Sequence, residues 1–162
     1  RVTLASAYGQ TGLTDKAMAR LAAQDFAVLV ERLREPGLTP YALRPVEVLA
    51  NTLEYVVHHE DLRRAQPDWA PRTLDPADDD TVWRAISMTG RALVRPAGVP
   101  VVLRRRDSET TSTLRRGTDP VVVTGSPVEL TCFLFGRTRV HGVDLAGPDD
   151  AIAKLRDADL GI

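Results

Sequence analysis

Cysteine and lysine are almost absent from this chain of 162 residues, which has a single cysteine, Cys132, and only Lys16 and Lys154 as lysines. A single cysteine excludes an internal disulfide, so we expect a reducing compartment, the cytoplasm. Because Cys132 lies in an apolar stretch, we expect a buried, unreactive thiol rather than a nucleophile. The preference for arginine over lysine indicates a GC-rich genome more than a binding function.

The chain also lacks a long apolar run and an excess of charge. No run approaches the about 20 apolar residues that span a bilayer, and no secretion signal is visible. With 21 basic and 22 acidic residues the formal net charge is -1, so we expect neither nucleic acid nor membrane as a partner. The runs Arg104–Arg106 and Arg115–Arg116 are expected to lie in solvent on a strand or turn.

Phosphate-binding and nucleophile motifs are missing as well. No glycine-rich loop followed by lysine is present, and no serine stands in a nucleophile context. Ser126-Pro127-Val128-Glu129 instead predicts a capping box at the start of a short apolar helix that ends at Gly136. His141 falls on a predicted strand, where a structural or surface position is expected.

Hydrophobic periodicity predicts an α+β protein. Residues 1–72 are interpreted as a partial, up-down helix bundle, and residues 73–162 as a small α+β domain with an antiparallel sheet. A proline-rich, acidic loop covers about 66–80, and Trp69 is expected to hold it against a neighbouring surface. Helices are predicted over 14–34, 45–65, 80–94, 126–135 and 147–158, and strands over 99–103, 110–114, 120–124 and 139–145.

The most informative stretch is the polar row of the second helix. Glu54 and His58 are four residues apart and Asp61 follows three residues later, so the three share one face of a helix. Imidazole nitrogen and carboxylate oxygen are ligands of divalent metals such as zinc. Glu54 and His58 would supply two ligands, and Asp61 would either ligate or support the imidazole. The alternative is an ordinary Glu–His pair on a helix surface.

The order of segments resembles the mycothiol-dependent maleylpyruvate isomerase family, a branch of the DinB-like metal-binding bundles. The resemblance rests on Glu54-x-x-x-His58-x-x-Asp61-Leu62, on Phe133-Leu134-Phe135-Gly136-Arg137, and on the closing run Gly147-Pro148-Asp149-Asp150-Ala151. The longer run 51–67 is similar to an actinobacterial subgroup of metal-binding proteins.

The resemblance implies a helix bundle followed by a sterol-carrier-like α+β domain. It implies one divalent metal, with Glu54 and His58 as two ligands and a histidine of an earlier helix as the third. No residue of this chain matches that histidine, so we expect it upstream of Arg1. The cofactors implied are the metal, with zinc as the first candidate, and the small thiol mycothiol. A metal-bound thiol loses its proton near neutral pH and can add to an activated double bond.

The leading hypothesis is therefore a thiol-dependent isomerase or transferase that acts on a small electrophile. For an acidic substrate, Arg137 is the candidate that binds a carboxylate, although an arginine also suits the C-terminal end of a helix. Two alternatives stay open: a non-enzymatic binding or regulatory module that has lost the complete metal site, and a hydrolase that uses metal-bound water.

Overall fold

The computed structural model describes Val28 and residues 44–161 of the chain. The chain divides into two compact units, Arg1–Val46 and Glu47–Ile162, and nearly all described residues belong to the second. The helix predicted over residues 14–34 and most of the predicted N-terminal bundle lie outside the described residues.

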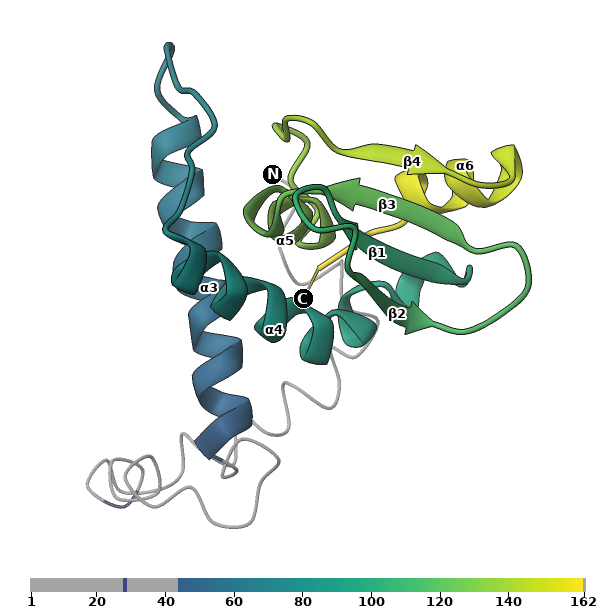
Figure 1. Ribbon diagram of the computed structural model, residues 1–162, viewed down its shortest axis with the longest axis horizontal. Helices are drawn as coiled ribbons and strands as arrows, with labels where there is room; N and C mark the ends of the chain where they lie inside the picture. The colour runs from purple at the N-terminus through teal and green to yellow at the C-terminus, as the bar shows by residue number, and fades with distance from the viewer. Residues whose placement is uncertain (1–27, 29–43, 162) are drawn as a thin grey trace. The chain divides into compact units, whose positions relative to one another are not determined.

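The described part is an α+β structure, as predicted, with helices and a four-stranded sheet (Figure 1). Most elements begin and end within a few residues of the expected positions. They are α3 (Arg44–Arg64), α4 (Pro76–Leu93), the 3-10 helix η3 (Arg95–Ala97), β1 (Val101–Arg105), β2 (Thr111–Arg115), β3 (Val121–Gly125), α5 (Pro127–Leu134), β4 (Asp144–Ala146) and α6 (Asp149–Asp157).

The sheet is mixed. The prediction of an antiparallel sheet is wrong for one strand pairing, that of β1 with β3. The strand order is β2-β1-β3-β4, and β1 pairs in parallel with β3, while the two outer pairings are antiparallel. The link from β2 to β3 therefore passes the start of β1 and places consecutive strands on opposite sides of it. Such a short link is typical of a hairpin, which is why the sequence favoured an antiparallel neighbour.

A close contact between two residues accounts for this unusual link. The Val121 amide donates to the Pro100 carbonyl at 2.9 Å, which starts β3 directly beside β1. A Cβ on Gly117 would stand 2.3 Å from Pro100 Cγ, so only glycine lets the link pass this close to Pro100.

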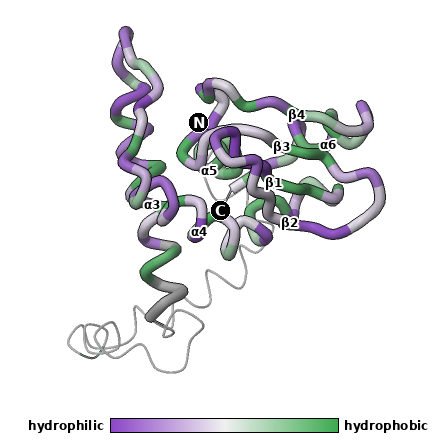
Figure 2. The backbone as a smooth tube through the Cα atoms, viewed as in Figure 1, coloured by the Kyte–Doolittle hydropathy of each residue, from purple (hydrophilic) through white to green (hydrophobic). Residues whose placement is uncertain are grey.

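A single apolar core joins one face of the sheet to α4, α5 and α6, and Leu53 of α3 also belongs to it. The inward side chains of β1 and β3 alternate along each strand and are fully buried, including Val101, Leu103, Val121 and Val123. They pack with buried residues of α4, α5 and α6, namely Ile86, Leu93, Leu130, Leu134 and Leu155. Figure 2 shows apolar residues on these elements, whereas the C-terminal part of α3 and the loop after it are largely hydrophilic.

The buried face of α3 begins apolar and ends charged. Leu53 and Val57 are 1% and 2% exposed. The next positions on that face are Glu60 and Arg64, which are 0% and 3% exposed. Because a helix repeats about every 3.6 residues, the same stripe that anchors α3 to the core also buries this ion pair.

Two further expectations need correction. The run Arg104–Arg106 is not uniformly solvated, because Arg105 is only 8% exposed and binds the carboxylates of Asp79, Asp80 and Asp107. The strand predicted over 139–145 is shortened to β4, since the backbone at 139 and 141 is bound to side chains instead of a neighbouring strand.

Cys132 is fully buried in α5, as predicted, and burial raises the pKa of its thiol to about 12. A thiol with that pKa stays protonated at neutral pH and is a poor nucleophile. None of the helices in the described part combines the length and the apolar character needed to cross a membrane.

Candidate functional site

The predicted metal-binding residues lie along the solvent side of α3. Glu54 and His58 are both exposed, one turn apart, and therefore share a face of the helix. Asp61 is half-buried, and its Oδ2 lies 3.9 Å from Nδ1 of His58. That separation is too long for a hydrogen bond, but it allows the Asp61 carboxylate to attract a protonated or metal-bound imidazole.

The described residues do not complete the predicted metal site. Among residues 44–161, no three side chains of histidine, cysteine, aspartate or glutamate converge in a way that could hold a metal ion. Glu54 and His58 are of the right chemical type for zinc, yet they supply two donors at most. Any third protein ligand has to come from outside the described residues.

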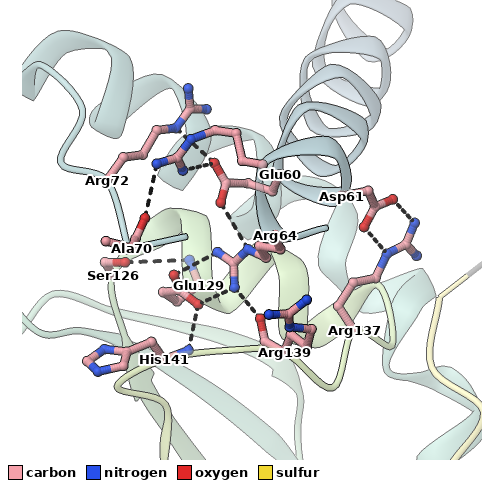
Figure 3. Close-up of polar contacts among 11 residues, drawn as sticks. Glu60, Asp61, Arg64, Ala70, Arg72, Ser126, Glu129, Arg137, Arg139 and His141 are labelled. Carbon is pink, nitrogen blue, oxygen red and sulfur yellow. Dashed lines mark hydrogen bonds and ion pairs between the residues drawn. The ribbon is translucent and has the colours of Figure 1, made fainter. Parts of the chain in front are cut away.

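Arg137, the predicted carboxylate-binding residue, is paired with Asp61. Its Nε donates to Oδ1 of Asp61 at 3.0 Å and its Nη2 donates to Oδ2 at 2.7 Å (Figure 3), while Nη1 donates to the Phe135 carbonyl at 2.7 Å. These hydrogen bonds hold the pKa of Asp61 below its ordinary value. The structure thus joins two predicted site residues that are 76 positions apart in the sequence.

Beside this pair lies a buried ionic network that links α3 to α5. Arg64 donates from Nε to Glu60 at 2.9 Å, and from Nη1 and Nη2 to the two carboxylate oxygens of Glu129 at 2.9 and 2.7 Å. Glu129 also accepts the backbone amide of His141 at 2.8 Å (Figure 3). The two buried carboxylates of Glu60 and Glu129 therefore contact one buried guanidinium. One negative charge is left for other cationic groups to compensate.

Additional arginines compensate that extra negative charge. Arg63 Nη1 lies 2.9 Å and Arg72 Nε 3.0 Å from Oε1 of Glu60. Trp69 closes the network, since the guanidinium of Arg64 stands 4.7 Å from its ring centroid and that of Arg139 stands 5.6 Å away. Trp69 thus holds its loop against α3, as predicted.

The charge states of this network follow from its hydrogen bonds. Burial alone would raise the pKa of Glu60, but hydrogen bonds from Arg63 and Arg64 outweigh burial and the net shift is downward. For Arg64, burial opposes the charged form, but the hydrogen bonds that it donates to Glu129 and Glu60 outweigh burial and raise the pKa of the guanidinium. At neutral pH both groups are therefore ionised.

We expect the protein to lose stability in acid because of these carboxylates. The pKa values of Glu60 and Asp61 are lower in the folded chain than the ordinary values near 4. Their contribution to the free energy of unfolding is therefore complete above about pH 5 and declines as the pH falls through the folded pKa values. Urea unfolding between pH 7 and pH 2.5 measures this decline. It should be smaller in Glu60→Gln, and an unchanged decline in that variant would contradict the assignment.

A cavity of about 300 Å³ opens at the C-terminal end of α3. Asp61 is its acidic lining residue, and three arginines approach it from α3 and from the segment after α5. The lining consists of Asp61, Arg64, Ala65, Gly136, Arg137, Thr138 and Arg139. Arg139 is exposed, and it forms no ion pair with any described residue. The cavity therefore offers a net positive surface to a small anion.

Sequence reasoning missed Glu60, Arg64 and Glu129, which lie at the centre of the network. Glu60 and Arg64 extend the apolar stripe of α3, so their position relative to Val57 was the signal that could have found them. Glu129 was hidden by the capping-box pattern. Ser126 does accept the Glu129 amide, at 3.5 Å, but the Glu129 side chain turns to Arg64 instead of back to Ser126, so the box is only half formed.

Comparison of the chain with protein-family models, with curated proteins and with solved structures produced no match. The family resemblance, and the metal and thiol that it implies, stay predictions.

Proposed function

We propose that this protein is a cytoplasmic, divalent-metal-dependent enzyme that uses a small thiol, mycothiol, to isomerise or modify a small electrophile carrying a carboxylate. The observation that supports it is a row of polar side chains on α3, Glu54, His58 and Asp61, that ends at a cavity lined by arginines. The row suits a metal, and the cavity suits an anion.

The spacing of the two parts fits a small substrate. At about 1.5 Å per residue, Asp61 lies roughly 7.5 Å along the helix from the middle of the Glu54–His58 pair. A carboxylic acid of a few carbons can extend over that distance, with its carboxylate at Arg139 and Arg137 and its reactive carbon nearer to His58. Arg139 has no carboxylate partner among the described residues and is free to bind first.

Each residue has a distinct role in this proposal. Glu54 and His58 would hold the metal, which, when bound, favours the thiolate form of a thiol near neutral pH. Asp61 pairs with Arg137, and its carboxylate, 3.9 Å from the His58 imidazole, would attract that imidazole when it binds the metal. Arg139 binds and positions the substrate carboxylate, because its planar donors match two carboxylate oxygens.

Metal content tests the ligand assignment. Elemental analysis of the purified full-length protein should approach one equivalent of divalent metal, and the value should fall sharply in Glu54→Ala and in His58→Ala. His59→Ala is the matched control, since it removes an exposed imidazole from the neighbouring position of the same helix and should leave the metal content unchanged. Equal metal content in all variants would exclude Glu54 and His58 as ligands.

Calorimetry tests the thiol hypothesis. Titration of mycothiol into the zinc-loaded protein should release heat that disappears after the metal is removed with a chelator. A binding signal of the same size in both preparations, or none in either, would exclude metal-dependent use of this thiol.

A second candidate function is a non-enzymatic module that binds small carboxylates. It is favoured by the cavity, which is formed entirely by described residues, whereas those residues supply at most two metal donors. Titration of fumarate into metal-free protein separates the two candidates. Binding without metal, weakened about tenfold in Arg139→Gln, would support the module, and binding that requires metal would support the enzyme.

A further inference from the structure

A second positively charged cavity lies at the other end of the α+β unit. It has a volume of about 580 Å³, within the range of small-molecule sites, and its lining residues are all arginines: Arg91, Arg95, Arg115 and Arg116. All four side chains are exposed. None of them forms an ion pair or a side-chain hydrogen bond with any residue between 44 and 161.

Backbone packing brings these arginines together. Arg91 is in the last turn of α4 and Arg115 is the last residue of β2. The helix approaches the strand closely at Gly90, where an added Cβ would stand only 3.1 Å from a methyl carbon of Leu114. The arginines that follow these two contact residues, Arg91 and Arg115, line the same cavity.

Ordinary structural roles account for the arginines only in part. Arg91 and Arg95 suit the C-terminal end of α4, and charges on β2 protect an edge strand from pairing with another chain. Neither role explains why four guanidinium groups line one cavity that contains no carboxylate. Seven other arginines of the described part pair with carboxylates, namely Arg63, Arg64, Arg72, Arg104, Arg105, Arg106 and Arg137, whereas Arg84, Arg139 and Arg156 are single arginines without such a pair among residues 44–161.

We infer that this arginine cavity binds the phosphate chain of a small molecule, a di- or triphosphate group. Four positive charges match a ligand with several negative charges better than a single carboxylate, and guanidinium groups bind phosphate oxygens in pairs. The lining contains no aromatic or aliphatic side chain, so recognition falls on the phosphates and not on an attached base. This site is separate from the cavity at α3 and does not depend on the function proposed for it.

Binding should relieve the repulsion among the four arginines and so stabilise the fold. Tripolyphosphate or pyrophosphate, titrated into the whole chain at about 50 mM NaCl, should give saturable heat and a raised melting temperature. The affinity should fall as salt is increased, because the contacts are between exposed charges. The absence of heat with both compounds at millimolar concentration would overturn the inference.

Charge-matched variants locate the site. Arg91→Gln and Arg115→Gln should each weaken tripolyphosphate binding about tenfold, the effect of losing a charge-assisted contact. Arg84→Gln removes the same charge from the same helix, two turns away and outside the cavity, and should change the affinity less than about twofold. An equal loss in Arg84→Gln would mean nonspecific attraction and would overturn the site. Far-UV circular dichroism checks that the variants fold.

Two more ligands distinguish between the possible sources of the phosphate chain. ATP that binds as tightly as tripolyphosphate supports recognition through the phosphates alone. Binding of ATP without binding of tripolyphosphate would overturn that claim. Binding of a single-stranded oligonucleotide without binding of tripolyphosphate would overturn it in favour of a nucleic-acid surface.

Discussion

Glu129→Leu is expected to lower the free energy of unfolding by about 4 kcal/mol, the effect of leaving a buried charge without its partner. The guanidinium of Arg64 would keep Glu60 but lose two hydrogen bonds, and the amide of His141 would lose its acceptor. Little water can reach the Arg64 guanidinium to replace Glu129, because Arg64 is 3% exposed and Glu129 5%. Urea unfolding at pH 7, followed by circular dichroism, measures the effect.

Two further variants separate the ionic network from ordinary surface charge. Arg104→Met breaks an exposed pair, 3.7 Å from Glu109, and should change the free energy of unfolding by less than about 0.5 kcal/mol. Arg64→Met/Glu129→Leu removes both partners of the buried pair, while Glu60 keeps Arg63 and Arg72. The double variant should therefore be more stable than Glu129→Leu, by about 1–2 kcal/mol. If the double variant loses as much free energy of unfolding as Arg64→Met and Glu129→Leu added together, the two residues act independently.

Gly136→Ala is expected to destabilise the fold by about 3 kcal/mol, through left-handed backbone strain and a steric clash. Gly136 ends α5 with a φ of 74°, and its amide and that of Arg137 bond back to Phe133 and Cys132 as in a Schellman motif. An added Cβ would stand 2.6 Å from the carbonyl oxygen of Leu160, so the backbone itself would have to move.

Gly98→Ala provides the matched control for this prediction. Gly98 has nearly the same φ, 69°, but a Cβ there meets no atom within 4 Å. Its substitution carries the conformational strain alone, about 1 kcal/mol. Equal destabilisation of the two variants in urea would show that the contact with Leu160 is unimportant. Because Gly136 and Arg137 both line the cavity at α3, only Gly136→Ala should also weaken fumarate binding.

Elements formed by local interactions were predictable from the sequence. Pro127 after Ser126 marks the start of α5, Gly136 marks its end, and the stripe through Leu53 and Val57 places one face of α3 in the core. These signals depend on residues within one or two helical turns. The positions of Glu54 and His58 on one exposed face follow from the same helical period.

Pairings between distant segments could not be predicted in this way. The parallel pairing of β1 with β3 depends on how closely Gly117 passes Pro100, a contact that no periodicity encodes. The partners of Arg64 are equally distant, since Glu129 is 65 residues further along the chain. A glutamate in a helical pattern carries no sign of burial until the arginine that compensates it is placed beside it.

The sequence by itself determined most helices and strands of the described part, the α+β class and the polar row on α3, because each depends on spacing within one segment. Only the tertiary structure decided which charges are buried, which pair and which are left free. An ionised group can be buried where it pairs with an opposite charge. The partner charges here belong to segments far apart in the chain, so they pair only in the folded structure. The two arginine-lined cavities arise in the same way, where the packing of helix, strand and loop brings together like charges that the sequence keeps separate.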